Sequence, residues 1–256
     1  MTGRLIAIAG ALIVWAAVGA APAGAAVLWD QNSGGDNSGT PSFDDTASTA
    51  YTETADDFVV PAGQIWTVDH IEVNGVYDPS AVGPNAITSI NVRFYTSSGS
   101  LPSVETGAGN LALTPSNGLL GPDFSVALAS PVSLSGGGAG ASYWFAPQVN
   151  EVHSISKWEW ENRSTFPGTN PAAARSTVAA GCPAPTWIVR TTVGCGLDVT
   201  VPDQKFSLSG TITPISSTIP FSGSTKKCKK KKKKHHSAAA AKKHKKKKCR
   251  KKKRKK

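Results

Sequence analysis

Short stretches in which apolar and polar residues alternate recur along the chain, separated by segments rich in Gly, Pro and Asn. The clearest lies at 90–95, where Ile90, Val92 and Phe94 point to one face of a strand that we expect to be half-buried. The same alternation is found at Phe124, Val126 and Leu128, and at Phe206, Leu208 and Ile212. The run from Ser142 to Val149 is apolar on both faces, which is typical of a central strand.

The longest patterned stretch runs from Ala55 to Tyr77. It predicts a strand at 58–60, a Pro-Gly turn at 61–63, and a long strand that carries Trp66 and ends at Tyr77. Trp66 and Val68 share one face of this strand, but Ile71 and Val73 have the opposite parity. One extra residue near Asp69 and His70 would restore a single apolar face, so the pattern predicts a β-bulge there.

Helical periodicity is almost absent from residues 27 to 225. The segment 171–180 would form one or two helical turns at most, and 31–40, rich in Gly, Asn and Ser, is expected to be a loop. Many short strands at regular spacing predict an all-β fold. We expect an antiparallel β-sandwich, and a jelly-roll-like arrangement is the favoured version.

Charge divides the chain into two unlike parts. Residues 226 to 256 contain 21 of the 28 Lys and Arg residues and no acidic residue, whereas all 17 Asp and Glu come earlier. Residues 27 to 225 carry only 6 Lys and Arg, a formal charge of −11. We therefore expect a sandwich domain at 27–213, a linker rich in Pro, Ser and Thr at 214–225, and a disordered Lys-rich tail at 226–256.

The first 26 residues have the pattern of a secretory signal peptide. Arg4 is followed by the apolar run Leu5 to Val18 and by the small residues Ala23-Gly24-Ala25. The apolar run is short for a membrane span, which needs about 20 apolar residues. We therefore expect an extracellular or cell-surface protein with no membrane span after cleavage; an uncleaved signal anchor is the alternative.

Four cysteines fit an oxidising compartment. A bridge between Cys182 and Cys195 would close a loop of about 14 residues and contribute roughly 3 kcal/mol in the chain-entropy model. Two free thiols are the alternative. Cys228 and Cys249 lie in the tail, about 31 Å apart on a straight helix, so a bridge there needs a hairpin or a disulfide-linked dimer.

Several segments together resemble a known group of proteins. They are VLWDQ at the start, ADDFVVPAG-x-x-WTV, INVRFYTSSGSLP, SYWF, KWEWEN, the Cys-bracketed loop and the closing PDQKFSLSGT. Over residues 27 to 213 the chain is similar to secreted bacterial β-sandwich domains, mostly uncharacterised, which carry varied C-terminal surface-anchoring tails. The resemblance implies export and a sandwich fold, and no catalytic residue. This chain has the basic tail where some relatives have a hydrophobic sorting helix.

The segment KWEWE holds the candidate glycan-binding residues. In a strand, Trp158 and Trp160 share one face, and Glu159 and Glu161 share the other. The two indoles would form a platform for sugar rings, or they would fill the core of the sandwich. The two glutamates are candidates for glycoside hydrolysis by residue type alone.

Other polar residues give weaker indications. Asp30, Asn32 and Asp36 partly match a calcium-binding loop, but Pro41 stands where a bidentate Glu is required. Asp56 and Asp57 would bind an ion or a turn amide, although solvated carboxylates are the favoured interpretation. The chain has none of the common hydrolase, zinc-protease or phosphate-loop motifs, so we expect no catalytic residue and no metal or other cofactor.

The tail should bind polyanions, and for an exported protein these are envelope polymers, anionic lipid and released DNA. The lysines in its two longest runs of lysine alone are Lys229, Lys230, Lys231, Lys232, Lys233, Lys234, Lys245, Lys246, Lys247 and Lys248. We expect a non-enzymatic surface protein that the tail retains at the cell envelope and whose sandwich binds glycan. The alternatives are a secreted carbohydrate-active enzyme, an extracellular nucleic-acid binder, and a tail that binds the protein's own acidic domain.

Overall fold

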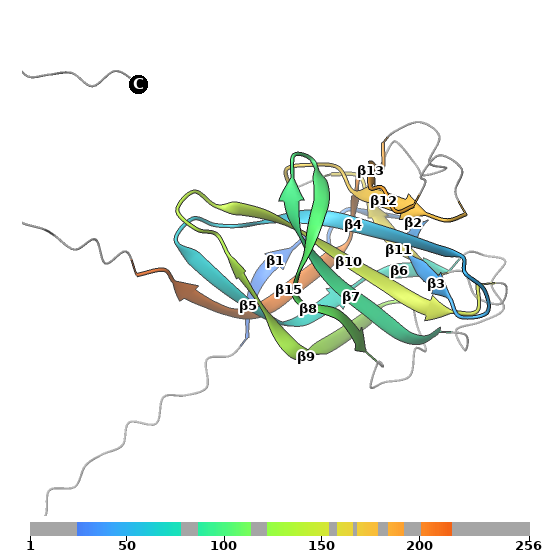
Figure 1. Cartoon of the computed structure of the whole chain (residues 1–256), viewed down its shortest axis with the longest axis horizontal. Coiled ribbons are helices and arrows are strands. Elements are labelled where there is room, and N and C mark those ends of the chain that lie inside the picture. Colours follow the sequence, from blue (N-terminus) through green and yellow to red (C-terminus); the bar gives the residue numbers. More distant parts are fainter. Residues whose placement is uncertain are drawn as a thin grey trace, which may run out of the picture. The chain divides into compact units, whose positions relative to one another are not determined.

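In a computed structural model of the chain, the described residues are 25–77, 87–113, 122–153, 158–165, 168–178, 184–191 and 201–216. Within these ranges the chain forms β-strands, turns and loops, and no helix that could cross a membrane (Figure 1). The predicted all-β, jelly-roll-like antiparallel sandwich is confirmed. The tail, the four cysteines, and the predicted signal peptide except its last two residues lie outside the described residues.

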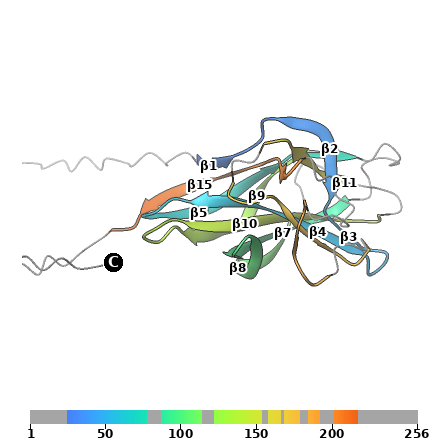
Figure 2. The same ribbon diagram turned by 90° about the horizontal axis from the view of Figure 1, so that it is seen from above.

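One layer of the sandwich is a four-stranded antiparallel sheet with the order β1-β15-β5-β9. Its strands are β1 (Ala26–Asp30), β15 (Phe206–Pro214), β5 (Gln64–Val73) and β9 (Phe124–Ser135). The first and last strands of the sandwich are therefore neighbours, with Ala26 opposite Gly210. Figure 2 shows the layers from the side, with β1, β15 and β5 above β10, β7 and β8 in the view.

The second layer is a seven-stranded sheet with the order β13-β12-β4-β3-β10-β7-β8. Its strands are β13 (Ile188–Val189), β12 (Ala173–Ser176), β4 (Tyr51–Val60), β3 (Phe43–Asp45), β10 (Ala141–Glu151), β7 (Ile87–Ser98) and β8 (Leu101–Leu113). Strand β10 pairs with both β4 and β7, and with β3 in parallel. The prediction of a central strand at 142–149 is confirmed.

A third, smaller sheet contains β14 (Asp203–Gln204), β11 (Trp158–Arg163), β2 (Gly35–Pro41) and β6 (Gly75–Tyr77). Strand β2 corrects the prediction of a loop over Gln31 to Thr40. Its glycines face the neighbouring strand: a Cβ on Gly35 would clash with Glu161, and one on Gly39 would clash with Glu159. Glycine is present here because the two strands approach closely. A Gly-rich strand of this kind resembles a loop when only the sequence is considered.

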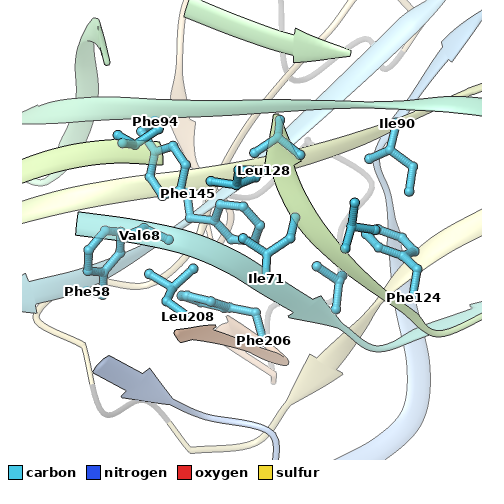
Figure 3. Close-up of a cluster of buried hydrophobic side chains, with 14 of the residues drawn as sticks. Phe58, Val68, Ile71, Ile90, Phe94, Phe124, Leu128, Phe145, Phe206 and Leu208 are labelled. Atoms are coloured by element: carbon cyan, nitrogen blue, oxygen red, sulfur yellow. The ribbon is translucent and has the colours of Figure 1, made fainter. Parts of the chain in front are cut away.

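The hydrophobic core fills the space between the two layers and extends under the third sheet. In Figure 3, side chains from β5, β9 and β15 meet side chains from β4, β7 and β10. Phe58 contacts the rings of Phe94 and Phe206 edge-on, at centroid distances of 6.3 and 6.4 Å. The predicted inward faces of the strands at 90–94 and 124–128 are confirmed, because all their apolar members are buried.

The predicted bulge is present in β5. Val68 pairs with Gly210 and His70 pairs with Ser209, so Asp69 is the extra residue. The register against β9 shifts at the same place. Trp66, Val68, Ile71 and Val73 are all buried as a result.

Four further details differ from the pattern-based expectations. The strand predicted to run to Tyr77 is divided, because β5 ends at Val73 and β6 belongs to the third sheet. The segment proposed for helical turns at 171–180 contains strand β12, which pairs with β4. Ile212 lies near the end of β15, beyond the residues that pair with β1, and is 46% exposed. The outer face of β7 is covered in part, since Asn91 and Tyr95 are also buried.

Gly210 provides a test of the bulge geometry. A Cβ there would clash with the backbone carbonyl oxygen of Thr67, which the β5–β15 pairing holds in place. We expect Gly210→Ala to lower the free energy of unfolding by about 1–3 kcal/mol, the usual cost of overpacking, as measured by urea denaturation. Gly138→Ala is the control, because nothing lies within 4 Å of its Cβ position. Equal stability of the two variants would contradict the geometry.

Candidate functional site

Trp158 and Trp160 do not form a surface platform. Strand β11 turns both indoles into the core, where they are 1% and 0% exposed. Each indole N–H donates to a backbone carbonyl, Trp158 Nε1 to Pro122 O at 2.8 Å and Trp160 Nε1 to Lys205 O at 2.7 Å. Of the two alternatives from the sequence, the core position is the one observed, and the proposed glycan platform was wrong at these residues.

Glu159 and Glu161 lie on the opposite face of β11, as the alternation predicts. Glu161 is 8% exposed and forms an ion pair with Lys205, Oε2 to Nζ at 3.0 Å. Glu159 is half-buried against Gly39. An ion-paired carboxylate packed against a neighbouring strand resembles a structural group more than a general acid, which needs a raised pKa and an open cleft.

Asp57 and its neighbour Asp56 are fully buried, contrary to the expectation of solvated carboxylates. Asp57 accepts hydrogen bonds from the backbone N–H groups of Thr169 and Asn170, and from the side chains of Thr169, Asn170 and Ser142. A Cβ on Gly168 would clash with the Asp57 carboxylate. Asp57 therefore fastens the loop 168–170 to strand β4.

Asp56 points to the other face of β4 and connects two more segments. Its Oδ2 accepts hydrogen bonds from Gln31 Nε2 at 2.6 Å and from the backbone N–H of Gln204 at 2.8 Å. Gln31 follows β1, and Gln204 lies in β14. The ADDF motif therefore has a structural role: its two carboxylates join β4 to three segments distant in sequence.

The buried carboxylates have raised pKa values. Burial, followed by the charge of Asp203, raises the pKa of Asp56 well above its usual range. Burial, followed by the charge of Asp57, raises the pKa of Asp203 to about 8, while Arg163 and Arg190 act in the opposite direction. Both carboxylate oxygens of Asp203 are buried without a hydrogen-bond partner among the described residues.

A cavity of about 200 Å³ opens on the outer face of the seven-stranded sheet. We call it the arginine pocket; it is lined by Asp44, Tyr51, Glu53, Arg93, Gln148 and Arg175. These residues come from β3, β4, β7, β10 and β12, so the pairing of five strands brings them together. Their spacing in the sequence gives no indication that they meet.

Glu53 is the centre of the arginine pocket and is 2% exposed. Its Oε2 accepts hydrogen bonds from Arg175 Nε at 2.9 Å and Nη2 at 2.6 Å. Its Oε1 accepts one from Tyr95 Oη at 2.6 Å and lies 3.6 Å from Arg93 Nη1. Burial and the charge of Glu53 raise the pKa of Tyr95 well above its usual value, so its hydroxyl remains a donor.

Aromatic rings hold Arg175 in place. Its guanidinium carbon lies 4.5 Å from the ring centroid of Trp187 and 5.9 Å from that of Tyr95. Burial alone would lower the pKa of Arg175, but the charge of Glu53 raises it above its usual value. The rings belong to a second apolar cluster on the outer face, with Ala55, Ala146 and Ala173 among its members.

Small residues make the hollow in the sheet. Ala146 of β10 lies directly opposite Arg93 of β7, and β10 separates β7 from β4. Tyr95 nevertheless reaches Glu53 on β4, across this intervening strand. The short side chain at position 146 leaves the room for that contact.

Gln148 orients Arg93 from beneath. Its Oε1 accepts hydrogen bonds from Arg93 Nη1 at 3.0 Å and Asn91 Nδ2 at 3.3 Å. Its Nε2 donates to the carbonyl oxygens of Phe43 and Thr52. Both ends of the amide are occupied, so Gln148 positions Arg93 and is not itself a ligand-binding group.

A larger cavity of about 280 Å³ lies beside β5 and β9. Its two carboxylates have internal partners: Glu72 accepts a hydrogen bond from Ser207, and Asp123 accepts one from Gly75 N. Within the ranges that the structure covers, no three His, Cys, Asp or Glu side chains could hold a metal ion. At the predicted calcium loop, Asp30 accepts a hydrogen bond from Asn32 N, and β2 begins at Gly35, so this segment does not have the fold of such a loop.

Comparison with known protein families, with curated proteins and with solved structures finds no match. The candidate site therefore rests on geometry alone, and the arginine pocket is the strongest candidate. The patterns in the sequence did not predict this pocket. A visible signal was the pair Arg93 and Arg175, two of only 6 cationic residues between residues 27 and 225.

The raised pKa of Asp203 predicts how stability depends on pH. Between about pH 4 and pH 8 the folded state holds a proton that the unfolded state releases, so the free energy of unfolding should fall as the pH rises. Urea denaturation at pH 5 and pH 8.5 measures this change. We expect Asp203→Asn to reduce this fall in the free energy of unfolding. The exposed control Asp123→Asn should show the same fall as the wild type. The same loss of stability in all three proteins would show that Asp203 is not responsible.

Proposed function

We propose that this chain is an exported, non-enzymatic binding protein. Its Lys-rich tail retains it at an anionic cell-envelope polymer or lipid surface, and its β-sandwich presents the arginine pocket to a ligand. The pattern of the first 26 residues, a positive residue and an apolar run followed by small residues, supports export.

The main support for the proposal is the separation of charge between the Lys-rich tail and the acidic domain region. A run of 31 residues with 21 Lys and Arg and no acidic residue follows a domain region with a formal charge of −11. Such a composition does not support a hydrophobic core, and its physical effect is attraction to polyanions. If a third of the cations engage an anionic membrane at about 1 kcal/mol each, the total is roughly 7 kcal/mol, a dissociation constant on the order of 10 μM.

The arginine pocket takes the role that the sequence suggested for Trp158 and Trp160. It is concave and open, and it holds polar side chains with fixed orientations, which are the groups that orient a ligand in a binding site. Hydrolysis has no comparable support, because Glu161 is ion-paired and lies on the outer face of a different sheet.

Envelope binding with and without the tail tests the proposal. The mature protein and a form ending at residue 225 are mixed with isolated cell envelopes across a salt series, and the bound fraction is measured. We expect only the full-length form to bind, and salt to release it, because screening weakens exposed charge interactions.

Two results would contradict retention by the tail. If both forms bind the envelope equally, the sandwich is responsible. If DNA displaces the full-length protein completely at low concentration, an extracellular nucleic acid becomes the better partner, since neutralising phosphates gives strong, salt-dependent binding without base specificity.

A further inference from the structure

We propose that the arginine pocket binds a single neutral sugar ring. This inference rests on the proposed function, because it names the ligand class of the same pocket. It follows from three properties of the lining: its balance of charge, the groups that remain available for a ligand, and its size.

The lining residues have no net formal charge. Arg93 and Arg175 oppose Asp44 and Glu53. A site for a free anion needs an excess of positive charge, and a site for a cation needs the reverse. A lining with both donors and acceptors suits hydroxyl groups, because each hydroxyl both donates and accepts a hydrogen bond.

The available groups are a subset of the lining. Arg175 and Glu53 satisfy each other, and Gln148 is saturated by its neighbours. Arg93 uses only Nη1 among the described residues, which leaves most of its five donors for a ligand. Across the pocket, the Asp44 carboxylate and the Tyr51 hydroxyl have no hydrogen-bond partner in the described ranges.

These three side chains match the surface of a sugar. Two neighbouring hydroxyls can accept from Arg93 and donate to the Asp44 carboxylate. The half-buried Tyr51 provides an aromatic surface for the C–H face of the ring and a hydroxyl for its rim. Arg175, held by Glu53 and Trp187, is a positioning residue that fixes one wall.

Size limits the ligand to one ring. The cavity of about 200 Å³ is smaller than the roughly 300 to 1,000 Å³ typical of sites for drug-sized ligands. A longer glycan would therefore enter with one terminal residue. Few contacts are available to so small a ligand, so we expect dissociation constants in the millimolar range.

The test is a titration of the full-length mature protein with single sugars, followed by saturation-transfer NMR. The panel contains glucose, galactose, mannose and N-acetylglucosamine, with glucuronate and glycine for comparison. We expect at least one neutral sugar to bind independently of salt. Arg93→Gln and Asp44→Asn should each weaken binding about 10- to 100-fold, the range for a lost hydrogen bond to a charged group. Glu72→Gln, in the other cavity, should bind as the wild type does.

Each other outcome has a definite meaning. Binding of glucuronate or glycine without any neutral sugar would overturn the ligand class. If Arg93→Gln also lost that binding, the pocket would still be the binding site. Neutral-sugar binding that is unchanged in both pocket variants would place the sugar elsewhere and overturn the inference. No binding of any member would overturn both this inference and the pocket's role in the proposed function, whereas the envelope experiment tests tail retention separately. Circular dichroism and thermal unfolding confirm that each variant is folded.

Discussion

Two adjacent buried carboxylates organise this sandwich. Asp56 and Asp57 point to opposite faces of β4, and each accepts hydrogen bonds from segments far away in the sequence. A buried carboxylate is costly unless its oxygens are satisfied, so these segments must be in place for β4 to be buried. The requirement connects β14, the loop at 168–170 and the residue after β1 to one central strand. The short pieces of the third sheet are held by this network as well as by apolar contacts.

The arginine pocket depends on the same strand. Glu53 lies on the Asp57 face of β4, two strands away from Tyr95 and Arg93 on β7. Its carboxylate is buried too, but here the hydrogen-bond donors are the side chains of Arg175 and Tyr95 and not backbone N–H groups. The second guanidinium in the pocket, that of Arg93, uses only its Nη1 in contacts with the described residues. The hydrogen bonds that the buried Glu53 carboxylate requires therefore also give the arginine pocket its oriented donors.

Local patterns in the sequence predicted the fold well. The alternation at 90–94 and 124–128 and the parity change around Asp69 depend only on neighbours along a strand, and the structure agrees with each. Local patterns along single strands could not predict the candidate site. Whether Trp158 and Trp160 face water or the core depends on which sheet covers β11, and the partners of Glu53 come from β7 and β12, 42 and 122 residues away along the chain. Strand β2 was missed for a related reason, because its glycines are explained by side chains on β11.

The pairing of the first and last strands gives the domain a direction. Strand β15 ends at Pro214, opposite Gln64, at the end of the sandwich where the β4–β5 turn lies. Tyr51 and Glu53 are at the other end of β4, a strand of 10 residues that spans about 30 Å. The chain therefore leaves the sandwich at the end where the β4–β5 turn lies. The Tyr51 and Glu53 side of the arginine pocket is at the opposite end of β4. Under the proposed retention by the tail, a ligand in the arginine pocket would bind at the end of the sandwich far from the attachment point.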